Sequence, residues 1–288
     1  MTTAQVSSRA KTCRDCGFDL PIGRTTCPHC GRPQLFPNVD IAEEQTERNR
    51  LQIRYENAMH SIQNRGCEAT AAHFELACRR SVAVFKVTLQ RLLRETATGT
   101  AIYETYYDLE RLRLSTSPPG KYNWDKLRQH AEIEILGSSD HRDQLHYACL
   151  SIGGHGLAYY GECTVELRDG MIGHRASCFE GNSAVLYSRD PGFNNCIRSS
   201  WAEKEKLCVA ALGHRLDIAT EISEFQSILV ENGLSGDDDR FIEVHVFGPM
   251  TCKTFSRVDI EEGNLTSEEQ LLRKAILQKL KTENVKVD

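Results

Sequence analysis

Two Cys-x-x-Cys pairs near the start of the chain constrain its folding more than any other feature of the sequence. The segment reads KTCRDCGFDLPIGRTTCPHCGRP, and ten residues separate the two pairs. Gly17 and Gly31 each follow a second cysteine, where glycine allows the left-handed residue of a tight turn. Thiolates in two such turns can converge tetrahedrally on one zinc ion. The predicted zinc ligands are Cys13, Cys16, Cys27 and Cys30.

This cysteine pattern resembles a zinc ribbon, and we assign residues 1–36 to it as a separate module. Four thiolates close the coordination shell, so the resemblance implies a structural zinc and gives His29 no ligand role. A module of this size cannot bury a core, and the metal would supply its folding energy. Its arginines leave open whether it binds nucleic acid, binds a protein or only closes the end of the chain: Arg14, Arg24 and Arg32.

The rest of the composition is that of a globular protein in a reducing compartment. The chain has 288 residues, 40% of them apolar and 26% charged, which is ordinary for a soluble protein. Its net charge of −5 argues against a general nucleic-acid coat or a membrane-surface protein. Eight of the twelve cysteines are scattered without a disulfide spacing. With no signal peptide and no long apolar run, we expect a cytoplasmic protein with no membrane partner.

Residues 37–115 have the pattern of a helical region. A first helix is predicted over 40–64, with apolar residues at helical spacing and Gly66 beyond its end. A second helix is predicted from one apolar stripe: Phe74, Cys78, Val82, Phe85, Leu89 and Leu92. The two would form an antiparallel hairpin, which serves either as a scaffold or as an arm for a regulatory partner or a second copy.

The segment STSPPGKYN, residues 115–123, indicates a linker, because two prolines and a glycine cannot continue a helix. Residues 116–288 then form an α+β domain with mixed or antiparallel strands, since helices fall between groups of strands and not in βαβ alternation. Strands are predicted at 144–152, 160–169, 174–179, 183–188 and 240–247. Helices are predicted at 124–136, 201–215, 221–232 and from 267 onward, where Thr266 and Glu269 have a capping-box spacing.

The stretch RFIEVHVFGP, residues 240–249, is the predicted strand with the most unusual face. Alternation places one apolar set on one side: Ile242, Val244 and Val246. The other side carries Phe241, Glu243, His245 and Phe247. A strand glutamate is ordinarily exposed to solvent. A carboxylate and an imidazole between two phenylalanines instead favour the wall of a cleft.

Motifs of the common nucleotide-binding folds and hydrolases are absent from the sequence. No GxGxxG leads from a strand into a helix, and no Walker loop, GxSxG elbow or HExxH is present. Gly153, Gly154 and Gly156 form a glycine-rich turn. A tight hairpin explains these glycines as well as a bound phosphate does.

The order of the pieces LHYACLS, GGHGL, YGECTVELRD, RASCFEGNS and FIEVHVFGP resembles the ADP-ribosyltransferase fold, in particular its bacterial toxin-type branches. The resemblance covers about residues 137–260 and implies a two-sheet domain that uses NAD as substrate. Members carry a basic or histidine residue on the first strand and a serine or threonine on the second. A glutamate lies on a late strand, before Gly-Pro.

The resemblance implies three catalytic residues. Glu243 matches the late-strand glutamate, which would hydrogen-bond the nicotinamide ribose and stabilise the charge that grows as nicotinamide leaves. His146 matches the first-strand position that holds the ribose and phosphate end of the cofactor. Ser177 matches the second-strand hydroxyl, and His245 would be an orienting neighbour of Glu243.

The same resemblance implies a set of cofactor-binding residues: His146, Tyr147, Gly156, Tyr160 and Arg175, with Tyr159 as an alternative to Tyr160 for stacking on nicotinamide. Arg175 also has a structural interpretation, an ion pair with Glu180 or Asp190. Phe241 stands where a glutamate or glutamine usually orients the acceptor in arginine- and cysteine-modifying members. The class of acceptor is therefore not predicted.

Two functions follow from these observations. The first is NAD-dependent ADP-ribosyl transfer to a macromolecular target, a protein or a nucleic acid, by a toxin or phage-defence effector with a structural zinc. The second is a non-enzymatic zinc-ribbon protein, regulatory or binding, whose C-terminal domain binds a partner or a nucleotide ligand. The first function requires His146, Ser177 and Glu243 around one cleft, and the second does not.

Overall fold

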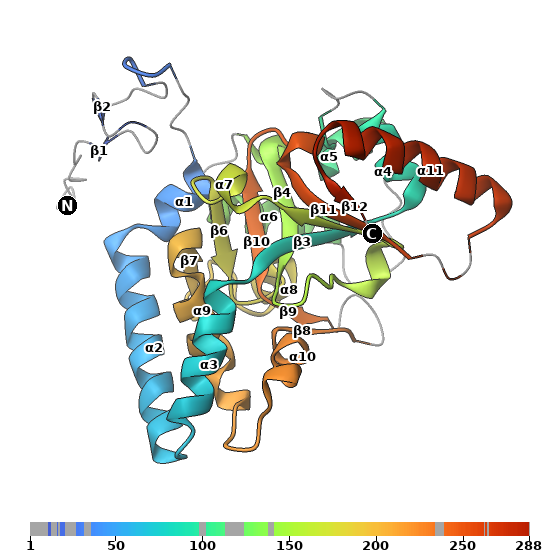
Figure 1. Ribbon diagram of the computed structural model, residues 1–288. Helices are drawn as coiled ribbons and strands as arrows, with labels where there is room; N and C mark the ends of the chain where they lie inside the picture. Colours follow the sequence, from blue (N-terminus) through green and yellow to red (C-terminus); the bar gives the residue numbers. More distant parts are fainter. Residues whose placement is uncertain are drawn as a thin grey trace.

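A central eight-stranded sheet organises the chain, with helices on both of its faces (Figure 1). The computed structural model describes residues 11–12, 16, 18–20, 27–31, 36–97, 102–112, 124–137, 141–233, 239–261, 263 and 265–287. The strand order is β12-β11-β5-β3-β4-β10-β6-β7. Neighbouring strands are antiparallel except for β11 and β12, which are parallel. The α+β class and the mixed pairing predicted from the sequence are confirmed.

The large sheet draws its strands from most of the chain after residue 81. They are β3 (Val82–Val87), β4 (Leu145–Ser151), β5 (Cys163–Leu167), β6 (Ala176–Phe179), β7 (Arg198–Ser200), β10 (Glu243–Phe247), β11 (Phe255–Ile260) and β12 (Lys286–Val287). Two small sheets pair β1 (Lys11–Thr12) with β2 (Asp19–Leu20) and β8 (Val230–Glu231) with β9 (Arg240–Phe241).

One face of the large sheet is apolar and carries the main core. Side chains alternate between faces along a strand, so Val244 of β10 shares this face with its cross-strand partners Ala148 and Cys178. Residues of several helices complete this core, and four of these helices contribute many of them, including the fully buried Phe74 and Leu92. These helices are α3 (Glu68–Arg79), α4 (Leu89–Thr96), α9 (Lys204–Leu212) and α11 (Ser267–Thr282). The long helix α2 (Gln45–Asn64) packs on α9 and α3 (Figure 1).

The opposite face of the sheet is polar where β4, β10 and β6 meet. Glu243 and His245 share it with Tyr147 of β4 and Ser177 of β6. Three helices cover this part, and the second of them contacts the other two: α1 (Pro37–Ala42), α6 (Trp124–Leu136) and α8 (Ser183–Arg189). Their apolar residues form a second cluster with Phe247 and the other buried rings of this face.

The remaining described elements are short. They are the helices α5 (Tyr106–Arg111), α7 (Asp169–Ile172) and α10 (Phe225–Leu229), and the 3-10 turns Arg142–Gln144, Ala158–Tyr160, Trp201–Glu203, Gly213–Arg215, Ile222–Glu224 and Cys252–Thr254. Residue 161 has to be glycine, because its φ is +139° and a Cβ atom there would overlap the backbone of Val87.

The predicted second helix of the region 37–115 is wrong in its middle. Val82–Val87 forms β3, which lies between β4 and β5 in the sheet. The segment VAVFKV is rich in valine, which favours a strand, and its odd and even positions contact different faces. The apolar spacing looked helical because α3 and α4 flank this strand and both bury residues on the same side of the sheet.

Two further strand predictions differ from the structure. Residues 183–188 form helix α8 instead of a strand, because the side chain of Asn182 accepts a hydrogen bond from Val185 N at 3.2 Å and caps the helix. The stretch 240–247 is divided between β9, which pairs with β8, and β10 in the large sheet. Phe241 is thereby removed from the strand of Glu243.

Other local predictions are confirmed. The helix expected over 124–136 is α6, and α11 begins with the predicted capping box. Thr266 N donates to the carboxylate of Glu269 at 2.8 Å, and Glu269 N donates to the Thr266 hydroxyl at 3.3 Å. The predicted linker at 115–123 lies outside the described residues.

Candidate functional site

Three cysteines of the N-terminal module come together. The Sγ atoms of Cys16, Cys27 and Cys30 all lie within 4.8 Å of one another, and those of Cys16 and Cys27 are 3.7 Å apart. A disulfide would bring two sulfur atoms to about 2 Å. Cys16 and Cys27 are therefore not joined by a disulfide, and the three sulfur atoms have a spacing that can hold a metal ion. Cys13, the fourth predicted ligand, lies outside the described residues.

The backbone and rings around the cysteines agree with this role. Gly31 adopts the left-handed conformation expected after a Cys-x-x-Cys pair, with φ at +70°, and its N–H donates to the Cys27 carbonyl at 2.9 Å. His29 stacks on the ring of Phe18, with the ring centroids 5.4 Å apart. The histidine therefore packs against an aromatic ring while the thiols cluster.

The large sheet separates the three predicted catalytic residues. Ser177 is the cross-strand partner of His245, so it shares the polar face with His245 and Glu243. His146 is the cross-strand partner of Val246 and lies on the opposite, apolar face. The sheet thus brings Glu243 and Ser177 to one face and His146 to the other.

Glu243 is the centre of a closed polar cluster. Its Oε2 atom lies 2.8 Å from Nε2 of His245 and accepts a hydrogen bond from Ser183 N at 2.9 Å. Because Ser183 is the first residue of α8, the carboxylate also fixes the start of this helix. Only 6% of Glu243 and 1% of His245 are exposed. The pair lies in the protein interior and not on the wall of a cleft.

Asn38 of α1 lies over Ser177. Its Nδ2 atom donates to the Ser177 hydroxyl at 3.1 Å and to the carbonyl of His245 at 3.0 Å. A third contact, to the carbonyl of Arg175, has a length of 3.2 Å. Since both Asn38 and Ser177 are buried, this hydroxyl accepts a hydrogen bond that attaches α1 to the sheet.

Tyr147 belongs to a buried network that the sequence did not reveal. Its hydroxyl donates to Glu132 of α6 at 2.6 Å, and its ring meets that of His245 edge to face. Tyr107 of α5 donates to the other oxygen of Glu132. Burial raises the pKa of Glu132, although both tyrosine hydroxyls and Arg128 oppose this. Glu132 is one acid on a predicted helix, so no pattern in the sequence indicates that it accepts these buried hydrogen bonds.

A pocket of about 710 Å³ opens beside His146. It lies between residues 102–112 and the ends of β4 and β10, and its volume is in the range of small-molecule sites, about 300 to 1,000 Å³. The residues that line it include Tyr103, Thr105, Asp108, Arg111, His146 and Pro249. Of these the sequence pointed only to His146, because the segment 102–112 has no recognisable motif.

His146 itself is buried and neutral. It is 4% exposed, and its Nδ1 atom has no hydrogen-bond partner. Burial, reinforced by Arg175 and Arg91, lowers the pKa of His146 to about 3, and the nearby Asp108 and backbone of Gly248 oppose this only partly. The imidazole is therefore uncharged at neutral pH.

The His146 imidazole packs against a chain of buried contacts formed by Tyr103, Arg91 and Glu95. The ring of Tyr103 lies 5.7 Å from that of His146, and the guanidinium of Arg91 lies 4.5 Å from the Tyr103 centroid. Nε of Arg91 donates to Glu95 at 2.8 Å. Burial raises the pKa of Glu95 to about 7 against the opposing charge of Arg91. Tyr103 N also donates to the Met250 carbonyl at 2.7 Å, which fixes this wall of the pocket.

Arg175 binds backbone carbonyls. Its Nη1 atom donates to Phe247 and Pro249 at 2.8 and 2.9 Å, and its Nε atom donates to Met171 at 3.0 Å. The expected ion pair with Glu180 is replaced by one between Glu180 and Arg54, at 3.0 Å. Asp190, the other expected partner, accepts hydrogen bonds from Asn194 and Asn195.

Gly156 and Tyr160 lie apart from the His146 pocket. Gly156 packs against Lys86, because a Cβ atom there would lie 2.8 Å from Cγ of that side chain. Tyr160 is 48% exposed, and its ring meets that of Tyr159 edge to face. Neither residue is among those that line the pocket.

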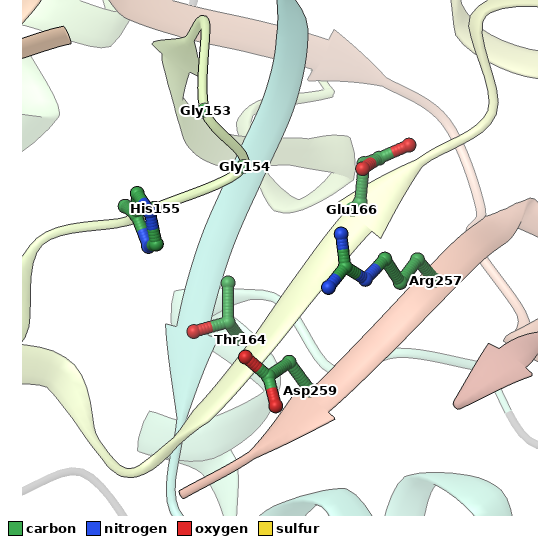
Figure 2. A pocket seen from close by; sticks show the side chains of 7 residues that line it. All are labelled: Gly153, Gly154, His155, Thr164, Glu166, Arg257 and Asp259. Carbon is green, nitrogen blue, oxygen red and sulfur yellow. The ribbon is translucent and has the colours of Figure 1, made fainter. Parts of the chain in front are cut away.

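The glycine-rich turn borders a much smaller pocket, of about 20 Å³, together with polar residues of β5 and β11 (Figure 2). This volume holds little more than one water molecule. The N–H groups of Ile152 and Gly153 donate to the side-chain oxygen of Gln226 at 2.7 and 2.9 Å. They are thus engaged within the protein, and this turn has no room for a phosphate.

Comparisons with known proteins give no family for this chain. No protein-family description matches the sequence, and no curated protein is significantly similar to it. Among the described residues, no helix is long and apolar enough to cross a membrane. The function must therefore be argued from the cysteine cluster, the buried Glu243 cluster and the His146 pocket.

Proposed function

We propose that this chain is a zinc-containing protein whose α+β domain binds a nucleotide ligand in the pocket beside His146. The observation that carries this proposal is the combination of about 710 Å³ of space with a buried imidazole whose Nδ1 atom has no partner. Ligand sites are mostly apolar cavities with a few convergent polar groups. Buried polar atoms are nearly always hydrogen-bonded, and the imidazole that carries this one lines the pocket.

Zinc is the metal that best fits the cysteine cluster. A Zn–S distance of about 2.3 Å with tetrahedral angles places two sulfur atoms about 3.8 Å apart. The Sγ atoms of Cys16 and Cys27 are separated by 3.7 Å. Cys13 would supply the fourth thiolate of the ribbon. Since four thiolates leave no open position, the zinc would stabilise the fold of the module and take no part in a reaction.

NAD and ADP-ribose belong among the nucleotides to be tested because of the resemblance to ADP-ribosyltransferases. In that function NAD is a substrate, and Glu243 stabilises the charge on its ribose as nicotinamide leaves. Glu243 and His146 lie on opposite faces of the sheet, which does not support one ligand in contact with both. Binding without turnover is therefore the first proposal. Transfer to a protein or nucleic acid by a toxin or defence effector is the second.

Calorimetric titration of the zinc-loaded full chain with NAD, ADP-ribose, ATP and GTP tests the first proposal. At least one of these should bind, and His146→Leu should weaken that binding at least tenfold because the hydrogen bond to the imidazole is lost. His60→Leu, on the exposed side of α2, is the matched control and should leave affinity unchanged. Absence of binding by all four nucleotides would contradict the proposal.

The same preparation separates binding from transfer and checks the metal. Release of nicotinamide from NAD, lost in Glu243→Gln, would favour the transferase. Binding with no release favours the binding protein. Elemental analysis should find one zinc per chain, and Cys27→Ser should lose it, because Cys27 is the buried member of the cluster.

A further inference from the structure

The described residues that line the His146 pocket carry little free positive charge. Among the described residues that line it, Arg111 is the one permanently charged cation, and its guanidinium is paired with Asp108. Glu104 and Asp143 add two more carboxylates to the lining. Glu104 is paired with Arg94 at 2.5 Å, whereas Asp143 is exposed. Among these described residues, an anion entering the pocket would therefore meet more negative than positive groups.

The two arginines closest to His146 do not change this. Arg91 donates to Glu95 and, at 2.7 Å, to the carbonyl of Glu104. Arg175 donates to the carbonyls of Phe247 and Pro249. Neither arginine is among the residues that line the pocket. Burial is the main reason that the pKa of His146 is lowered, and the charges of the two arginines add to it.

The described lining at His146 suits an uncharged ring. Tyr103, Ile102 and Pro249 supply apolar surface next to the imidazole. A neutral imidazole has one donor nitrogen and one acceptor nitrogen. It can therefore pair with the ring nitrogen, amide or amino group of a heteroaromatic base. To a phosphate it could offer only an uncharged donor, which binds more weakly than a charge-assisted one.

We infer that this pocket binds a nucleoside by its base, with the imidazole of His146 as the group that contacts the base, and leaves any phosphates outside in solvent. This inference rests on the proposed nucleotide-binding function and adds the orientation of the ligand to it. The chemical class of ligand is a neutral heteroaromatic base attached to a sugar, and its phosphates add nothing to affinity.

Titration of the zinc-loaded full chain with a series from nucleoside to triphosphate tests this orientation. The probes are adenosine, AMP, ATP and NAD, the guanosine series, and pyrophosphate alone. The nucleoside of the series that binds should do so at least as tightly as its phosphorylated forms, and pyrophosphate should not compete with it. Asp143→Asn, which removes an exposed carboxylate of the lining, should strengthen triphosphate binding about two- to fivefold relative to nucleoside binding.

The outcomes separate this inference from the proposal on which it rests. If no nucleoside or nucleotide binds, the proposed function itself fails. If nucleotides bind and His146→Leu weakens them, but affinity rises with each phosphate or pyrophosphate competes, the orientation is wrong while the function stands. His146→Asn retains a donor and an acceptor and should recover part of the loss seen in His146→Leu. Equal loss in both, with unchanged thermal unfolding, would also count against base contact by His146.

Discussion

His245 and His146 lie on neighbouring strands of the same sheet, one register position apart, and their surroundings are opposite in kind. His245 faces Tyr147 across the strands, and His146 faces Val246. The first ring is 1% exposed and lies 2.8 Å from the carboxylate of Glu243. The second is 4% exposed, has an unpartnered nitrogen, and borders a pocket of about 710 Å³.

The difference shows that burial of a polar side chain does not by itself identify a functional site. The cluster around His245 consists of groups that satisfy one another, and helices α1, α6 and α8 cover it. Such a cluster fixes packing. At His146 the protein buries a polar ring at the edge of a pocket and leaves its Nδ1 atom without a partner. Three experiments can break or sharpen this contrast.

The largest expected effect is on the pH dependence of stability, through His146. Its folded pKa is about 3, below the ordinary value of 6.5 that holds in the unfolded chain. Between these values the unfolded chain binds a proton that the folded protein does not, so stability falls as the pH is lowered. Between pH 7 and pH 4 this contributes a loss of about 3 to 4 kcal/mol. Urea unfolding of wild type and His146→Leu across this range should show the difference.

The contribution of Glu95 to stability changes with pH in the opposite direction, and it provides the internal control. Burial raises its pKa from 4.5 to about 7, so the folded protein holds a proton there that the unfolded chain has lost. Its contribution to stability therefore falls as the pH rises from about 4.5 to 7. Glu95→Gln should remove this fall and leave the contribution of His146 intact. Equal acid sensitivity of wild type and His146→Leu would mean that the imidazole is not buried as described.

The second effect concerns the closed cluster. Glu243→Ala leaves His245 and Ser183 N without their partner in the interior, and we expect the free energy of unfolding to fall by about 3 kcal/mol. Nucleoside affinity should not change, because Glu243 does not line the pocket. Denaturant unfolding and calorimetry measure the two quantities on one preparation.

Glu243→Gln is the matched variant, since it keeps an oxygen acceptor for one of the two donors. It should lose roughly 1 kcal/mol. A stable Glu243→Ala protein that no longer binds ligand, or no longer releases nicotinamide, would reverse the comparison and make Glu243 part of the functional site.

The sequence revealed the face of Glu243 and His245 but not what covers it. Strand alternation is local, so residues 243–247 could be assigned to faces correctly. Whether a face is open or closed depends on α6 and α8, whose packing is set by contacts far along the chain. For the same reason the sequence does not decide whether His146 or Tyr147 shares the face of Glu243, because this depends on the register between β4 and β10.

Helix ends that carry a capping motif were the most predictable part of the fold. The capping box at Thr266 and Glu269 marks the start of α11 within the sequence itself. The strand Val82–Val87 was missed because the apolar spacing continued across it from α3 to α4. The pocket was not visible in sequence, because Tyr103 and Asp108 meet His146 only through the pairing of residues 102–103 with 250–251.

The smallest expected effect tests whether the hydrogen bond between Tyr147 and Glu132 only stabilises the fold, like the cluster around Glu243. Tyr147 lies on the same face as His245, and its hydroxyl donates to Glu132 at 2.6 Å. Tyr147→Phe removes this hydrogen bond but keeps the ring that packs against His245. Glu132 is fully buried and retains the hydrogen bond from Tyr107, so we expect a loss of only about 1 kcal/mol in unfolding free energy. Nucleoside binding should stay within twofold of wild type. A tenfold loss of binding with unchanged stability would show instead that the polar face communicates with the pocket across the sheet.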